Sequence, residues 1–145
     1  TRKVKDIVEE LYATYDVVIP DHLEYNIVRG PEDVYVDVNR SSMMQVMSNL
    51  VNNAVKFTKE RSITMGWQCT DDKAIIFLED TGIGIPEEKQ ELIFDRYYKE
   101  SSSTAGAGIG LSLCRRLVEN MHGKIQVKSE VGKGSRFELV FKKTE

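Results

Sequence analysis

Two asparagines and a lysine form the first group of residues in this sequence that can take part in chemistry. Asn49, Asn53 and Lys56 are spaced i, i+4 and i+7, so on a helix all three side chains point the same way. Asparagine is a mediocre helix former, and two amides on a partly buried edge need hydrogen-bond partners. The spacing is typical both of a ligand-binding edge with one cation and of a solvated helix face.

A carboxylate followed by glycines forms the second group. Asp80 ends a predicted strand, and the segment DTGIGIP at residues 80–86 continues into a turn. Gly82 and Gly84 permit positive φ and allow the backbone to approach a ligand closely. Taken alone, the segment is better explained as an ordinary strand-to-helix loop closed by Pro86.

A glycine-rich segment forms the third group. Gly106, Gly108 and Gly110 directly precede a predicted helix over residues 109–121, where free amides and the positive end of the helix dipole can hold phosphate. The segment lacks the GxxxxGK[ST] pattern and does not follow a strand in a βαβ unit, so the P-loop and Rossmann folds are disfavoured. Together, the three groups predict a pocket for a base, a metal ion and a polyphosphate.

Apolar periodicity predicts the elements that must position these groups. The central helix is expected to begin at Asn39 or Ser41 and to carry an apolar stripe made of Met43, Met47, Leu50, Ala54 and Phe57. We expect further helices over residues 6–15 and 109–121 and a short one after Pro86, with strands around residues 23–28, 34–36, 62–70, 73–80, 125–129 and 135–141. This order predicts an α+β fold, a mixed and mostly antiparallel sheet covered on one face by helices.

Composition excludes several classes of protein. The chain has 145 residues, of which 30% are charged and 41% hydrophobic, as in one globular domain rather than a disordered or membrane-spanning chain. Twenty Lys and Arg against 23 Asp and Glu give a net charge of −3, so the overall field does not attract nucleic acid. Two cysteines without CxxC spacing make a zinc site improbable and favour a reducing compartment.

The sequence contains, in this order, the segments NLVNNAVKFT, DTGIGIP, IFDRYYK, GAGIGL and GKGSRF. They resemble the N, G1, F, G2 and G3 boxes of the catalytic, ATP-binding domain of sensor histidine kinases, within the wider family of gyrase, Hsp90-type and MutL-type ATPases. The resemblance implies a two-layer α/β sandwich of the Bergerat type. It also implies a single domain over residues 1–145, with an N-terminal helix and strands in residues 1–38 and the five boxes in residues 39–145.

The same resemblance assigns roles around ATP and Mg²⁺. It implies that Asn53 coordinates Mg²⁺ through its side-chain oxygen, that Asn49 contacts phosphate or metal-bound water, and that Lys56 meets a phosphate oxygen. Phe57 stands where an aromatic residue lines the nucleotide pocket, although its spacing also allows a core role with one exposed ring edge. Asp80 resembles the carboxylate that accepts a hydrogen bond from the 6-amino group of adenine, which favours ATP over GTP.

Further positions follow from the G1, G2, G3 and F boxes. Gly82 and Gly84 let the backbone pass beside the base, and Ser135 stands where the family commonly has a threonine that reaches the base through water; a plain turn serine is the alternative. The G2 box, whose amides take the phosphates, falls on Gly106, Gly108, Gly110 and Leu111. Lys99 is expected at the terminal phosphate, with Arg96 as a second candidate, in a lid that starts at the hinge residue Phe94.

The nature of the phosphate acceptor follows from position 49. Relatives that hydrolyse ATP carry a glutamate four residues before the metal-binding asparagine, as a general base for water. Here that position is Asn49, whose amide cannot take a proton, so transfer to an external nucleophile is favoured. The acceptor is expected to be a histidine in an HE or HD motif on a helical hairpin. Neither His22, read as a surface loop residue, nor His122, read as a helix C-terminal cap, has that setting.

The resemblance implies two partners, a histidine phosphotransfer and dimerisation domain of the same protein and then a response regulator, and no nucleic acid is expected. The isolated domain is expected to be a monomer and the full protein a homodimer in a bacterial two-component system. The domain would be cytoplasmic, and parent proteins of this family are often anchored in the inner membrane. The alternatives are an ATP-hydrolysing relative, a serine kinase of the anti-sigma type, and a nucleotide-binding module without kinase activity.

Overall fold

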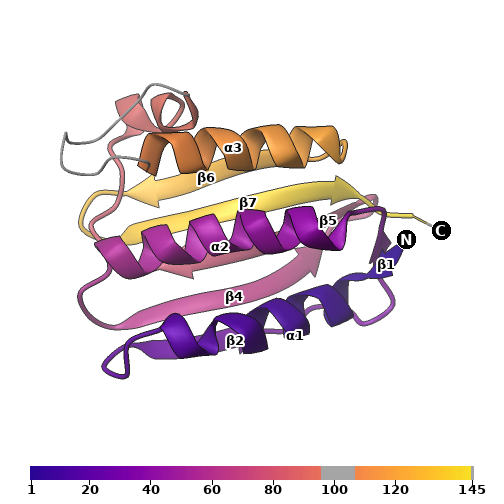
Figure 1. Ribbon diagram of the computed structural model, residues 1–145, viewed down its shortest axis with the longest axis horizontal. Coiled ribbons are helices and arrows are strands. Elements are labelled where there is room, and N and C mark those ends of the chain that lie inside the picture. The colour runs from indigo at the N-terminus through magenta and orange to yellow at the C-terminus, as the bar shows by residue number, and fades with distance from the viewer. Residues whose placement is uncertain (96–106, 145) are drawn as a thin grey trace.

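A five-stranded sheet with three α-helices on one of its faces makes up the protein (Figure 1). The structure is a computed structural model that describes residues 1–95 and 107–144, without the side chains of residues 107–109. Its helices are α1 (Val4–Tyr15), α2 (Arg40–Phe57) and α3 (Ala107–Asn120), with short 3₁₀ turns at Asp16–Val18, Glu87–Lys89 and Leu92–Phe94. Its strands are β1 (Arg2–Lys3), β2 (Glu24–Val28), β3 (Tyr35–Val36), β4 (Ser62–Cys69), β5 (Lys73–Asp80), β6 (Lys124–Glu130) and β7 (Gly134–Lys142).

The main sheet has the order β2-β4-β5-β7-β6, and β1 pairs with β3 in a small separate sheet. Pairs β4–β5, β5–β7 and β6–β7 are antiparallel, whereas β2 and β4 are parallel. Short turns join β4 to β5 and β6 to β7 as antiparallel hairpins, whereas the parallel pair of β2 and β4 needs the long connection that contains α2. The α+β prediction, with a mixed and mostly antiparallel sheet, is confirmed.

The core lies between the sheet and its helices. Alternate residues of β4 and β5 point into it, because successive side chains on a strand face opposite sides. The inward positions are Ile63, Met65, Trp67, Ala74, Ile76 and Leu78, against Met43, Met47, Leu50 and Ala54 of α2. The predicted stripe on α2 is thus confirmed for these four residues, whereas Phe57 is half-buried and lies outside the core cluster.

Local signals account for the start of α2 and for the end of α3. Asn39 is the N-cap of α2, because its Oδ1 accepts a hydrogen bond from the Ser42 amide at 2.9 Å. His122 follows α3 with a φ of +64°, and the Gly123 amide donates to the Val118 carbonyl at 2.9 Å. This is the left-handed ending common to helices, so the predicted capping role of His122 is confirmed.

The face of the sheet without helices is closed by polar side chains. Phe77 of β5 is 3% exposed, and the Arg136 guanidinium lies 3.8 Å from its ring centroid. Glu138 is 1% exposed; its carboxylate accepts from Gln126 Nε2 and from Arg136 Nε, each at 2.7 Å. Among the described residues, none of the helices combines the length and apolar character needed to cross a bilayer.

Candidate functional site

The polar edge of α2 faces the start of α3. Asn49 and Asn53 are half-buried and Lys56 is exposed. The Asn49 side-chain amide donates to the Gly110 carbonyl at 3.3 Å, so it joins the two helices across the edge. The predicted groups on α2 and α3 are therefore adjacent in space.

Lys56 and Phe57 lie at the last turn of α2. The Lys56 Nζ atom is 5.4 Å from the centroid of the Phe57 ring, so the cation covers one face of a half-buried aromatic residue. The Phe57 carbonyl accepts from the Ile83 amide at 3.2 Å. This bond ties the end of α2 to the loop that follows β5.

Asp80 is the last residue of β5 and is 9% exposed. Its Oδ1 atom accepts from the Gly82 amide at 2.9 Å and from the Ser135 amide at 3.3 Å. Burial raises the pKa of the Asp80 carboxyl above its usual value, and these two amide donors partly oppose the rise. Among the described residues, no hydrogen bond to Oδ2 is found. Oδ1 is therefore held by the backbone, and Oδ2 is left to accept from a ligand.

The loop after Asp80 needs glycine at two positions. Gly84 has a φ of +78°, which is unfavourable for residues with a side chain. A Cβ atom on Gly82 would lie 2.4 Å from the Phe57 carbonyl oxygen. The backbone of this loop therefore packs directly on the end of α2, as the glycine pattern predicts.

Ser135 pairs with Asp80 across β5 and β7, and the contact to Asp80 runs through its amide. Its hydroxyl bonds the Ser129 Oγ at 2.8 Å. Ser129 also accepts from the Ile85 amide at 2.7 Å and donates to the Gly134 carbonyl at 2.8 Å. Ser129 thus holds the loop and β7 together, although no pattern in the sequence marks it.

The glycine-rich segment differs in one respect from the prediction. The segment was expected to precede a helix beginning at residue 109, but α3 begins at Ala107, so Gly108 and Gly110 lie within its first turn. The first amides of a helix have no acceptor within it, and in the described part of α3 these are the amides of residues 107–109. Leu111 is 7% exposed and packs in the core, so its side chain supports the helix rather than the pocket.

Three predicted site residues, Arg96, Lys99 and Gly106, lie outside the described residues. Phe94 is described and is 5% exposed. Its ring meets Phe137 edge to face, with centroids 6.2 Å apart, and the Arg115 guanidinium lies 5.6 Å from its centroid. Phe94 therefore packs in the hydrophobic core, and its role as the hinge of a lid stays a prediction.

The site is thus assembled at one end of the sheet. Figure 1 shows the end of α2 and the start of α3 at the same end of the molecule, where β5 also ends at Asp80. The contacts Asn49–Gly110, Phe57–Ile83 and Asp80–Ser135 join α2, α3, β5 and β7 there. The Asp80 carboxylate can accept from the amino group of a purine. The side chains of Asn49, Asn53 and Lys56 and the start of α3 can bind an attached polyphosphate.

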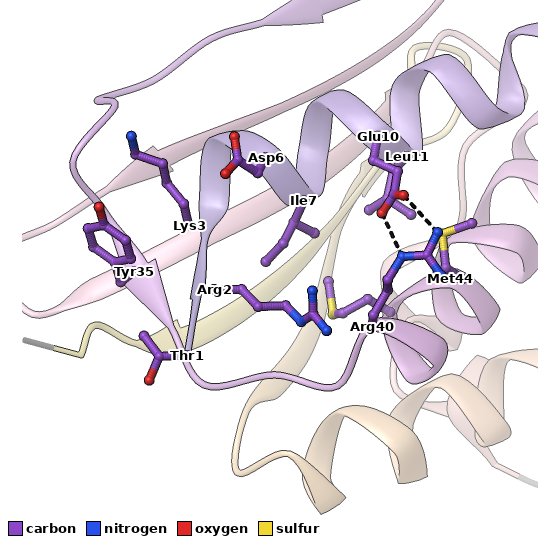
Figure 2. A pocket seen from close by; sticks show the side chains of 11 residues that line it. Thr1, Arg2, Lys3, Asp6, Ile7, Glu10, Leu11, Tyr35, Arg40 and Met44 are labelled. Atoms are coloured by element: carbon purple, nitrogen blue, oxygen red, sulfur yellow. Dashed lines mark hydrogen bonds and ion pairs between the residues drawn. The ribbon is translucent and has the colours of Figure 1, made fainter.

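A cavity of about 460 Å³ lies elsewhere, between α1, β1 and the first residues of α2. Figure 2 shows Arg40 paired with Glu10 at its wall; the two hydrogen bonds measure 2.9 and 2.7 Å. Arg40 is the first residue of α2, whereas Asn49 and Asn53 lie in its C-terminal half. None of the predicted site residues lines this cavity.

Known proteins resemble this chain in sequence over most of its length. Residues 38–145 match the family described as "Histidine kinase-, DNA gyrase B-, and HSP90-like ATPase". The aerobic respiration control sensor protein ArcB of Escherichia coli K12 is 42% identical over 115 residues, which cover 75% of this chain and 14% of ArcB. The chain therefore spans a small part of the length of this relative.

Solved structures resemble the fold over nearly the whole chain. The nucleotide-free catalytic domain of histidine kinase ThkA is 28% identical with a TM-score of 0.82, covering 99% of this chain and 96% of that one. A structure of ThkA in complex with response regulator protein TrrA has 27% identity and a TM-score of 0.80, covering 99% and 41%. These similarities agree with the two-layer sandwich predicted from the motifs.

Proposed function

Because the chain belongs to the histidine kinase-, DNA gyrase B- and HSP90-like ATPase family, we propose that its site binds Mg²⁺-ATP and supplies the γ-phosphoryl group to a histidine. The observation that carries the proposal is the buried Asp80 carboxylate, with Oδ1 held by two amides. The remaining oxygen can accept from the 6-amino group of adenine, whereas the 6-oxo group of guanine would face it with a second acceptor.

The phosphates would lie between α2 and α3. Amides at the start of α3 provide donors and the positive end of a dipole, and Lys56 adds a cation that no ion pair among the described residues engages. Asn49 holds the start of α3 against α2 through the Gly110 carbonyl. Binding here orients the polyphosphate and neutralises charge, and these two effects make up most of the catalysis of phosphoryl transfer.

The side chains present fit a magnesium ion that is bound largely by ATP. Within the described ranges there is no group of three or more His, Cys, Asp or Glu able to hold a metal. Mg²⁺ keeps several waters and commonly takes one or two protein oxygens together with phosphate, and the half-buried Asn53 amide provides such an oxygen. When bound, the ion would neutralise phosphate charge and orient the γ-phosphoryl group.

The acceptor would lie outside residues 1–145, on a helical dimerisation domain of the same parent protein. Asn49 has no basic group with which to activate water, so transfer to a nucleophile supplied by another domain is favoured over hydrolysis. The ThkA structure with TrrA supports a response regulator as the next acceptor. We propose that the parent protein is a homodimeric sensor kinase with this domain in the cytoplasm.

Transfer of labelled phosphate tests the proposal. The protein is mixed with γ-labelled ATP, Mg²⁺ and the helical hairpin domain of its parent protein, and Asn53→Ala and Asp80→Asn are compared with Asn52→Ala. Asn52 is the exposed neighbour of Asn53 on α2 and serves as the control. We expect acid-labile label on the hairpin, reduced about tenfold or more in the two site variants and unchanged in the control.

Other outcomes identify the alternatives. Acid-stable label would indicate a serine kinase, and release of free phosphate without labelled protein would indicate a hydrolysing ATPase. Unchanged transfer by both site variants would contradict the site itself.

A further inference from the structure

Thr58, the residue that follows α2, buries a hydroxyl group for which the described part of the chain offers no hydrogen-bond partner. The residue is 4% exposed, and its Oγ1 atom makes no hydrogen bond among the described residues. Buried polar atoms in native proteins are nearly always paired, because an unpaired one costs about 1–3 kcal/mol. An unpaired hydroxyl beside the candidate site therefore suggests that it gains a hydrogen-bond partner when ligand binds.

Asp80 is that neighbour. The Phe57 carbonyl, which precedes Thr58, accepts from the Ile83 amide, so this stretch of backbone lies against the loop after β5. A Cβ atom on Gly82 would meet both the Phe57 carbonyl at 2.4 Å and Asp80 Oδ1 at 3.0 Å. Burial is the largest influence on the pKa of the Asp80 carboxyl and raises it, whereas the neighbouring Thr58 hydroxyl has a smaller influence that lowers it.

We propose that Thr58 is a positioning residue for Asp80: when nucleotide binds, its hydroxyl donates to the Asp80 carboxylate and keeps it ionised and aimed at the amino group of the base. This inference rests on the proposed function, since it assigns a further residue to the same purine site. Oδ1 already accepts two backbone amides, so the hydroxyl is a third donor to one carboxylate. Three donors offset the cost of burying the charge.

The Thr58 hydroxyl is expected to lower the stability of the free protein and to raise its affinity for ATP. Thr58→Val replaces the hydroxyl with a methyl group of similar size and removes an unpaired buried polar atom. The variant is expected to be at least as stable as the parent toward urea in the absence of nucleotide. It should nevertheless bind ATP more weakly, because Asp80 loses a donor and its ionised form becomes less favourable.

Binding of ATP and of inosine triphosphate at several pH values tests the proposal. Inosine carries an oxo group in place of the 6-amino group and the same triphosphate, so the ratio of the two affinities isolates the contact to the base. At neutral pH, Thr58→Val should lower ATP affinity about tenfold and leave inosine triphosphate affinity within about twofold. As the solution is acidified, Thr58→Val should lose its preference for ATP at a higher pH than the parent, because Asp80 protonated on Oδ2 presents a donor to the 6-amino group.

Thr58→Ser retains the hydroxyl and should behave like the parent, and Thr58→Ala carries the same test if the valine variant does not fold. Equal losses for both nucleotides, or an unchanged pH midpoint, would overturn the proposal and leave Thr58 a packing residue. Failure of the parent protein to bind ATP would instead refute the proposed function. Weak ATP binding by Asp80→Asn with parent-like binding by Thr58→Val would refute the role of Thr58 alone.

Discussion

Asp80 combines a fixed oxygen and an available oxygen in one side chain. The Gly82 and Ser135 amides both donate to Oδ1, so these donors decide how the carboxylate is turned. An asparagine at position 80 would satisfy the same amides with its oxygen and present its NH₂ group to the ligand. The change therefore replaces an acceptor with a donor at one defined place.

We predict that Asp80→Asn exchanges the base preference. ATP affinity should fall about tenfold or more, because two donors then face each other, while inosine triphosphate affinity should not fall. Calorimetric titration of both nucleotides measures this. Asp71→Asn, in the exposed turn between β4 and β5, is the matched control, and a parallel loss of both nucleotides in the site variant would contradict the assigned contact.

Residue types and spacing predicted much of this site but not its supporting side chains. Asn49 and Asp80 were recognisable because their neighbours form helix and turn patterns in the sequence. Thr58 was not recognisable, because its importance depends on burial. Ser129 was not recognisable either, because its importance depends on the pairing of β6 with β7. A lone serine or threonine carries no such information until the chain is folded.

At the scale of elements, the N-terminus of α2 depends on one cap. The Asn39 side chain accepts from the Ser42 amide, and the sequence alone left Asn39 and Ser41 as equal candidates. We predict that Asn39→Ala lowers the free energy of unfolding by about 1 kcal/mol. Ser41→Ala, at an exposed helical position, should change it by less than about 0.5 kcal/mol.

Urea unfolding followed by circular dichroism compares these two variants. ATP affinity should be unchanged in both, since the site lies at the other end of α2. A larger loss of stability from Ser41→Ala than from Asn39→Ala would show that the cap is wrongly assigned.

Glu138, on the face of the sheet without helices, makes the free energy of unfolding depend on pH. Burial raises the pKa of Glu138, but hydrogen bonds from Gln126 and Arg136 and the charge of Lys128 outweigh it, so the pKa lies below its ordinary 4.5. A carboxyl whose pKa is lowered by folding stabilises the protein fully above 4.5, and this contribution is lost as pH falls through the folded-state value.

Glu138→Gln should therefore lower the free energy of unfolding by about 1–3 kcal/mol at pH 7, and the difference from the parent should shrink below pH 4.5. Urea titrations at several pH values measure both quantities. Glu130→Gln, on the exposed end of β6, is the control. A deficit that stays constant down to acid pH would mean that the effect is one of packing rather than of charge.

Local patterns predicted the helices and hairpins because each has its own periodicity and punctuation. They did not predict the parallel pairing of β2 with β4, which depends on a crossover through α2 rather than on a turn. They also placed the start of α3 two residues late, because glycine has poor helix propensity and the apolar pattern begins only at Ile109. Contact with Asn49 supports that first turn through the Gly110 carbonyl.

The candidate site and the cavity beside α1 lie at opposite ends of α2. At one end, the last turns of α2 lie beside the start of α3 (Figure 1), and hydrogen bonds join α2 to Gly110 and to the loop after β5. At the other, the cavity between α1 and the first turn of α2 carries the Arg40–Glu10 pair (Figure 2). Overall charge and composition could not indicate which of these regions binds a ligand, whereas the order of the motifs pointed to the region at the end of α2.

The most direct test is to map nucleotide binding by NMR. Amide spectra of isotope-labelled protein are recorded while a non-hydrolysable ATP analogue and Mg²⁺ are added. We expect shift changes to concentrate at residues 49–58, 80–85 and 107–111. Changes confined to residues 1–11 and 40–44 around the cavity, or no changes at millimolar nucleotide, would contradict this expectation.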